Sequence, residues 1–299
     1  MKTLIPLQSA IPATQVCFSF LAQALRPGLR RKGATLALSV LFTLTAHAQT
    51  PTDSLHLLDT LPIQATFATA DNLGNIYVIT TQNAVEKYSP DGTFQFRYSN
   101  NRLGAATALD VTNPLKVLVW YADFRTVVFL NRSMTALGEL NLIQAGYPEV
   151  RTVASAADGN LWLYDEVAFQ LKKVTPEGQT KFESQALNLI QSKRIAINCI
   201  RDKGAEVLAS DAELGVLRFD VYAQFQQVLP WKGIARFALR RSMLAYQGTE
   251  AVHIEQLQVP ASRSLPLPDS VRKTGGTSWI APGLLLVQNG EILELWQWQ

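Results

Sequence analysis

The feature that most constrains the fold is a repeat of short apolar runs. Six runs begin at residues 75, 116, 160, 206, 242 and 283, at spacings of 41, 44, 46, 36 and 41 residues. A second β-rich run begins 8 to 10 residues after the start of each one. Four strands in about 42 residues, repeated six times, predict an all-β fold, a six-bladed β-propeller with four-stranded blades. A single blade exposes both faces of its sheet, so the blades must pack against one another in a ring.

Turn residues separate the runs and set the expected domain bounds. DNLGN, TNPLK, ADGN and DKGAE precede first runs, and SPDG and TPEG follow second runs. Asp-Gly and Pro-x-Gly supply the backbone angles that tight hairpins need. The weakly helical segment around 183–193 is interpreted as a connection between blades. The propeller domain is predicted at 49–299, with blades at about 63–100, 104–142, 147–187, 193–230, 233–268 and 271–299, the last completed by 54–62.

The two ends of the propeller domain predict how the ring closes. The last unit ends at EILELWQWQ and is one strand short, whereas SLHLLDTLP at 54–62 precedes the first blade without a partner. We therefore expect 54–62 to pair with 290–298 as the outer strand of the sixth blade. This pairing would remove the exposed sheet edges of an open ring.

The N-terminal segment predicts export. Residues 1–48 contain five of the 27 basic residues and none of the 24 acidic ones, and an apolar run ends in AHA before Gln49. This pattern is typical of a cleaved signal peptide, here with an extended n-region; the alternative is a buried apolar helix. The mature chain would lie in the periplasm, at the outer membrane or outside the cell, without a transmembrane segment. Its net charge falls to about −2, which argues against a nucleic-acid partner.

Two blades carry a motif that resembles a known superfamily. The motif consists of D-x-x-G-N or a shortened form of it, a strand that begins with Ile or Leu followed by an aromatic residue, and then Ser/Thr-Pro-x-Gly. It occurs in ADNLGNIYVITTQNAVEKYSPDG and in ASAADGNLWLYDEVAFQLKKVTPEG. They resemble the six-bladed propellers of the NHL/YWTD-like superfamily, and 110–131 resembles exported bacterial propellers of unassigned function. The resemblance implies the fold but no single function, because lactonases, lyases, receptor modules and scaffolds share it.

Residues with catalytic potential do not form a recognisable pattern. A calcium-dependent lactonase would need several oxygen ligands at one channel mouth. We expect none of the candidate metal ligands to repeat at the same strand position from blade to blade. Only His56 and His253 remain after cleavage, no serine is expected beside a histidine, and Cys199 is expected to be an inert buried thiol. The sequence therefore predicts no catalytic residue, no metal ligand and no cofactor. The metal candidates considered were Asp110, Asp123, Asp165, Asn198 and Asp211.

A repeated arginine is one candidate binding feature. Three successive blades are expected to open their innermost strand with Arg151, Arg194 and Arg236. Guanidinium groups around one channel mouth would bind a carboxylate or phosphate. The alternative is that each arginine caps a loop and points into water.

The second candidate is the WYADFR segment in the turn between the middle strands of blade two. Tyr121, Asp123 and Arg125 lie in this segment, and Tyr164 and Asp165 occupy related positions in blade three. Tyrosine and arginine are enriched in binding hot spots, so these residues are predicted to contact a partner. The alternative is that Trp120 and Tyr121 pack between blades, which we expect for Trp120.

These observations predict a non-enzymatic interaction or scaffold module of the bacterial cell envelope, with an envelope protein as its partner. Binding of a small anionic ligand at the channel mouth is the first alternative. A metal-dependent, lactonase-like hydrolase is the second.

Overall fold

The computed structural model describes residues 54–190 and 195–298. The predicted signal peptide and Arg194 lie outside the described residues. All secondary structure reported below belongs to the compact unit Pro51–Gln299.

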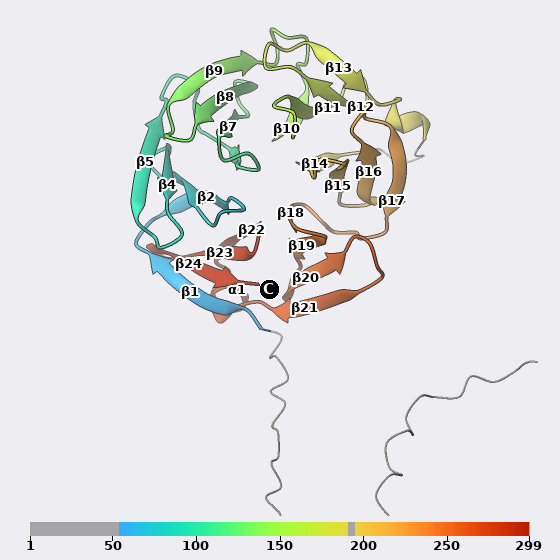
Figure 1. Ribbon diagram of the computed structural model, residues 1–299. Coiled ribbons are helices and arrows are strands. Elements are labelled where there is room, and N and C mark those ends of the chain that lie inside the picture. The colour runs from blue at the N-terminus through green and yellow to red at the C-terminus, as the bar shows by residue number, and fades with distance from the viewer. Residues whose placement is uncertain (1–53, 191–194, 299) are drawn as a thin grey trace, which may run out of the picture. The chain divides into compact units, whose positions relative to one another are not determined.

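Six antiparallel sheets of four strands each form a ring (Figure 1). In each sheet one edge strand lies nearest the axis, and we number the strands of a blade outward from it, so that this innermost strand is the first. This arrangement confirms the predicted fold. Blade one contains β2 (Ala65–Ala70), β3 (Ile76–Thr80), β4 (Ala84–Tyr88) and β5 (Phe94–Ser99). Blade two contains β6 (Ala108–Asp110), β7 (Lys116–Tyr121), β8 (Thr126–Asn131) and β9 (Ala136–Asn141). Blade three contains β10 (Val150–Ser155), β11 (Leu161–Asp165), β12 (Gln170–Val174) and β13 (Thr180–Glu183).

The remaining blades repeat this order. Blade four contains β14 (Ile197–Asp202), β15 (Glu206–Asp211), β16 (Gly215–Asp220) and β17 (Phe225–Leu229). Blade five contains β18 (Phe237–Arg240), β19 (Met243–Gln247), β20 (Ala251–Gln256) and β21 (Ser262–Pro266). Blade six contains β22 (Thr277–Ala281), β23 (Leu284–Asn289), β24 (Ile292–Gln297) and β1 (His56–Leu61). Helical turns in the described chain are limited to η1 (Leu187–Leu189) and α1 (Asp269–Arg272), both in connections between blades.

Strand β1 closes the ring. It runs antiparallel to β24, with His56 opposite Gln297 and Leu61 opposite Leu293. The strand nearest the N-terminus of the described chain therefore completes the last sheet, as the sequence predicts. In the described residues, no helix is long and apolar enough to cross a membrane.

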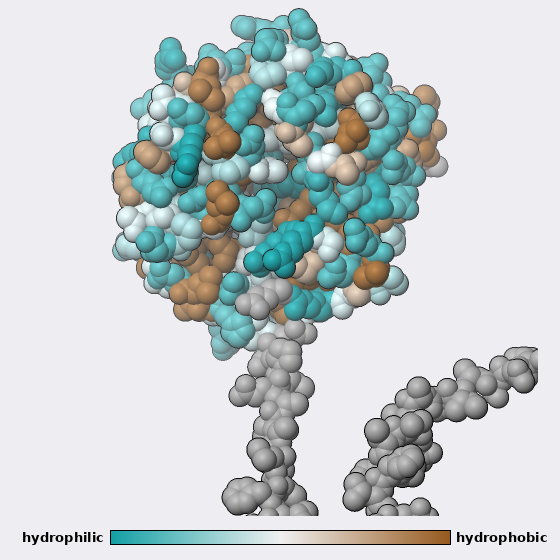
Figure 2. Space-filling model, viewed as in Figure 1, coloured by the Kyte–Doolittle hydropathy of each residue, from teal (hydrophilic) through white to brown (hydrophobic). Residues whose placement is uncertain are grey.

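The core lies between the blades. The side chains of a second strand alternate between its two neighbours, so that Val117 and Val119 pack toward blade one whereas Leu118 and Trp120 pack toward blade three. Trp120 is 3% exposed, which confirms that it packs between blades. The outer surface seen along the ring axis is mostly hydrophilic (Figure 2).

The strand order assigns every loop to one of two ends of the ring. Because neighbouring strands are antiparallel, the turns between first and second strands lie at one end. The turns between second and third strands, and the connections between blades, lie at the opposite end. We call the first the pocket end, for the reason given below, and the second the opposite end.

Candidate functional site

A pocket of about 430 Å³ lies on the ring axis at the pocket end. All six blades line it with the ends of their innermost strands and the turns that follow. We call it the axial pocket. Its lining includes Thr69–Asn72, Leu109–Pro114, Ser155–Ala157, Arg201–Gly204, Ala238, Leu239, Arg241, Ile280 and Pro282.

Three buried aspartates stand where innermost strands end. Asp71 directly follows β2, Asp110 ends β6 and Asp202 ends β14, and these residues are 2%, 4% and 8% exposed. Asp71 Oδ1 accepts hydrogen bonds from the backbone N–H groups of Leu73 and Asn75, at 2.9 and 3.0 Å. Each carboxylate in this way holds the turn that follows its strand, as short polar side chains commonly do.

Two of these aspartates also connect neighbouring blades. Asp110 Oδ1 accepts a hydrogen bond from the N–H of Thr112, and Asp110 Oδ2 accepts one from the N–H of Ser155 in blade three at 3.1 Å. Asp202 Oδ2 accepts hydrogen bonds from Ala157 N–H at 3.1 Å and Trp162 Nε1 at 2.8 Å, both in blade three. The carboxylate oxygens are therefore already bound by the protein.

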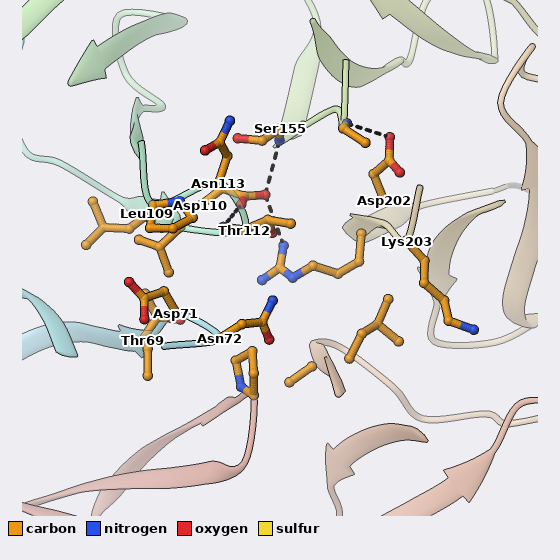
Figure 3. Close-up of a pocket in the computed structure, with 18 of the residues that line it drawn as sticks. Thr69, Asp71, Asn72, Leu109, Asp110, Thr112, Asn113, Ser155, Asp202 and Lys203 are labelled. Carbon is orange, nitrogen blue, oxygen red and sulfur yellow. Dashed lines mark hydrogen bonds and ion pairs between the residues drawn. The ribbon is translucent and has the colours of Figure 1, made fainter. Parts of the chain in front are cut away.

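Arg201 is the cation nearest the pocket interior. Its Nη1 lies 3.7 Å from Asp110 Oδ2, so a side chain of blade four reaches a carboxylate of blade two (Figure 3). The same nitrogen donates a 2.9 Å hydrogen bond to the carbonyl oxygen of Ile200. The structure shows no other polar contact of this guanidinium among the described residues, which leaves N–H donors facing the pocket. The Arg201 side chain is 23% exposed.

The other cations at the pocket are Lys203 and Arg241. Lys203 Nζ is 3.1 Å from Glu206 Oε1. Arg241 is exposed and makes no ion pair within the described part of the chain. Among the aspartates and these cations, Arg201 is the group placed to meet a ligand inside the pocket.

Two of the three arginines predicted to line a channel mouth, Arg151 and Arg236, lie where innermost strands begin, at the opposite end from the axial pocket. Arg151 Nε is 3.0 Å from Glu166 Oε1, and the Arg151 side chain is 49% exposed. Arg236 directly precedes β18, and its guanidinium lies over the Phe67 ring at 5.1 Å. Arg194 is outside the described residues, so a ring of three arginines is not placed by the structure.

The aromatic residues predicted to contact a partner are buried instead. Tyr121 is fully buried and Tyr164 is 1% exposed, because both pack between blades. Burial raises the pKa of the Tyr164 phenol, and nearby carboxylates add to this effect. Asp165 is 5% exposed; its Oδ1 accepts backbone N–H groups of Val167 and Ala168, and Lys172 Nζ is 2.9 Å from its Oδ2. These residues support the blades and do not form an accessible surface.

Asp123 and Arg125 lie in the turn between β7 and β8, as predicted. Asp123 is exposed, whereas Arg125 is half-buried and its Nη1 donates to the carbonyl oxygen of Ala122. A positive φ of 46° at Arg125 fits this tight turn. The binding role of these two residues stays a prediction.

One expected absence is wrong. Ser264 Oγ lies 2.9 Å from His253 Nδ1 on the two outer strands of blade five, so a serine does neighbour a histidine. The register that places His253 opposite Ser264 brings them together. This pair is distant in the fold from the lining of the axial pocket. Cys199 is buried, as expected.

Sequence reasoning named Asp110 as a candidate at a channel mouth but missed Asp71, Asp202 and Arg201. Among the metal candidates, Asp165 and Asp211 both end second strands, so the expectation that no candidate repeats at one strand position is wrong. Aspartates also recur at the ends of innermost strands in blades one, two and four. Turn residues follow each of these innermost-strand aspartates, as in DNLGN and DKG. An aspartate at a strand end followed by turn residues is the sequence signal that could have located them. Arg201 occurs in a single blade, so no repeat pointed to it.

Comparisons with known proteins identify the fold. No family model and no curated protein matches the sequence. Among solved structures, a streptogramin B lyase aligns with a TM-score of 0.52 and 11% identity over 82% of this chain and 87% of that one. A catalytically inactive histidine-to-alanine variant of virginiamycin B lyase from Staphylococcus aureus, with quinupristin, aligns with a TM-score of 0.51 and 10% identity over 77% of this chain and 79% of that one.

These matches correct the predicted function. The solved structures named here are lyases, and no finding supports a scaffold role, so the prediction of a non-enzymatic interaction or scaffold module is wrong. At such low identity the likeness shows the fold alone. The NHL/YWTD-like resemblance is not confirmed.

Proposed function

We propose that this chain binds a small anionic molecule in the axial pocket, with Arg201 as the anchoring cation. The observation that carries the proposal is a difference between the charged groups of the pocket. Arg201 keeps guanidinium N–H donors that bind no protein group, whereas the aspartate oxygens already accept hydrogen bonds from the protein. A guanidinium presents parallel N–H donors that fit a carboxylate or a phosphate.

The local charge supports an anion rather than a cation. Asp71, Asp110 and Asp202 are buried and accept hydrogen bonds from backbone or indole N–H groups, so their oxygens turn toward the protein. Arg201 has one ion pair, with Asp110 at 3.7 Å, and the exposed Arg241 has none among the described residues. An incoming anion would gain charge-assisted hydrogen bonds inside a pocket that is partly shielded from water.

Uncharged polar groups complete the ligand-facing surface. Asn72, Thr112 and Asn113 belong to the turns after β2 and β6, and the Asn72 side chain extends toward the middle of the pocket (Figure 3). Amide and hydroxyl groups supply directional hydrogen bonds, which is how binding pockets commonly fix the orientation of a ligand.

Turnover of the bound molecule is the second candidate, favoured by the structural neighbours, which are lyases. A histidine-to-alanine change leaves virginiamycin B lyase catalytically inactive. The described lining of the axial pocket contains no histidine, so any turnover here would depend on another group. Incubating the chain with quinupristin and following the compound by liquid chromatography tests this candidate; an enzyme-dependent product peak would establish it.

Calorimetric titration with phosphate and with acetate tests anion binding. The wild-type chain should bind at least one of the two probes, and Arg201→Gln should weaken that binding at least tenfold, since a charged hydrogen-bond pair is lost. Arg151→Gln is the matched control, because Arg151 lies at the opposite end and pairs with Glu166, and it should change binding less than twofold. Equal weakening by both variants, or no binding of either probe, would overturn the proposal.

We also propose that residues 1–48 direct export and are removed. N-terminal sequencing of the protein recovered outside the cytoplasm should then begin at Gln49. A mature protein that starts at Met1 would contradict this.

A further inference from the structure

The wall of the axial pocket is chemically asymmetric. Blades one, two and four contribute carboxylates, amides and the Arg201 guanidinium. Blades five and six contribute hydrocarbon from Ala238, Leu239, Ile280 and Pro282, and blade five also contributes the exposed Arg241. Leu239, Ile280 and Pro282 are half-buried, so part of their surface is open to the pocket.

Blades one and six also differ in the length of the turn after the innermost strand. In blade one, five residues from Asp71 to Asn75 connect β2 to β3, and the aspartate is needed to bind the free N–H groups of this longer turn. In blade six, Pro282 and Gly283 alone connect β22 to β23, and the positive φ of 79° at Gly283 allows the tight hairpin. Such a hairpin leaves few N–H groups to satisfy, so no acidic residue is required at the strand end.

We propose that the ligand of the axial pocket is an amphipathic anion, with a carboxylate or phosphate head at Arg201 and an apolar body against Leu239, Ile280 and Pro282. This inference rests on the proposed anion binding and adds the chemical class of the remainder of the molecule.

The volume and the apolar wall support this class. About 430 Å³ is more than an inorganic anion needs and lies in the range of pockets for small organic ligands, about 300–1,000 Å³. A fully polar ligand would leave Leu239 and Ile280 against water or against its own polar groups. An apolar body would remove that surface from water, which favours binding in proportion to the area covered.

Titration calorimetry with acetate, octanoate and octylamine separates the two parts of the ligand. Octanoate should bind the full chain at least tenfold more tightly than acetate, and octylamine should bind at least tenfold more weakly than octanoate. In the double variant Leu239→Asn/Ile280→Thr, the preference for octanoate over acetate should fall at least fivefold. Ile292→Thr is the matched control, because Ile292 lies on β24 and does not line the pocket.

The possible outcomes distinguish this inference from the proposed function. Equal affinities for acetate and octanoate, both lost in Arg201→Gln, would overturn the apolar body and leave anion binding in place. Octylamine binding as tight as octanoate binding, or octanoate binding that persists in Arg201→Gln, would overturn the proposed function itself. If the double variant keeps the wild-type preference for octanoate over acetate and also the wild-type thermal stability, the assignment of the apolar wall would be overturned as well.

Discussion

The two ends of the ring use charged residues differently. At the pocket end, buried aspartates hold the turns after the innermost strands, and Arg201 keeps donors available on the axis. At the opposite end, Arg151 pairs with Glu166 and Arg236 lies over Phe67, so the arginines there already have partners. Arg201 stays available to a ligand because Asp110, the carboxylate beside it, also accepts hydrogen bonds from the N–H groups of Thr112 and Ser155.

The largest expected effect comes from opening the ring, which would destroy both ends. Deleting residues 54–62 removes β1 and exposes the edge of β24, so the chain should lose its cooperative thermal transition. Differential scanning calorimetry measures this. Because His56 lies opposite Gln297, the same residues joined after the C-terminus by a short hairpin linker should restore folding. A wild-type melting temperature in the deletion variant would contradict the closure mechanism.

The next largest effect is a difference in stability between variants of one aspartate at each end of the ring. Asp110→Ala should destabilise the fold by about 3 kcal/mol, since it leaves the N–H groups of Thr112 and Ser155 without their acceptor. Asp123→Ala, in an exposed turn at the opposite end, should change stability by less than about 0.5 kcal/mol. Urea denaturation of both variants measures the difference. Equal losses would show that the pocket-end aspartate is not structural.

A smaller effect concerns Glu294, a carboxylate held by side chains rather than by turn N–H groups. Burial opposes its charged form, but hydrogen bonds from Ser270, Asn289 and Trp296 outweigh burial and lower its pKa. The stabilisation is therefore present above the unfolded pKa of about 4.3 and is lost as pH falls through the lower folded pKa. Glu294→Gln should cost about 1.5 kcal/mol at pH 7 and progressively less in acid. A cost independent of pH would contradict the charged role.

The smallest effect is expected at Arg151. Arg151→Gln removes an ion pair with a half-exposed side chain, so stability should fall by about 0.5 kcal/mol or less, and added salt should reduce the difference. Anion binding should be unchanged. Loss of anion binding in this variant would move the binding site to the opposite end.

The sequence predicts the ring well because period and turn chemistry are local. The spacing of runs such as NIYVIT and KVLVWY locates second strands, and the terminal strand SLHLLDTLP indicates closure. The site depends on distances across the axis, which periodicity does not encode. Tyr164 is placed in the correct strand, yet the prediction of exposure fails because alternate residues of that strand face a neighbouring blade.

The contact between Arg201 and Asp110 shows the same limit. The two residues lie 91 positions apart in the sequence, in two blades with blade three between them. They meet because the blades are arranged around one axis. Reasoning from repeats favours residues that recur, such as the arginines before innermost strands. A binding residue present in one blade needs the assembled ring to be recognised.

A crystal structure of the chain with a bromine-terminated octanoate would locate both parts of the ligand. We expect a carboxylate within hydrogen-bond distance of the Arg201 guanidinium and an anomalous bromine peak against Leu239 and Ile280, inside the axial pocket. A carboxylate bound at the opposite end, beside Arg236 and Phe67, would contradict this expectation.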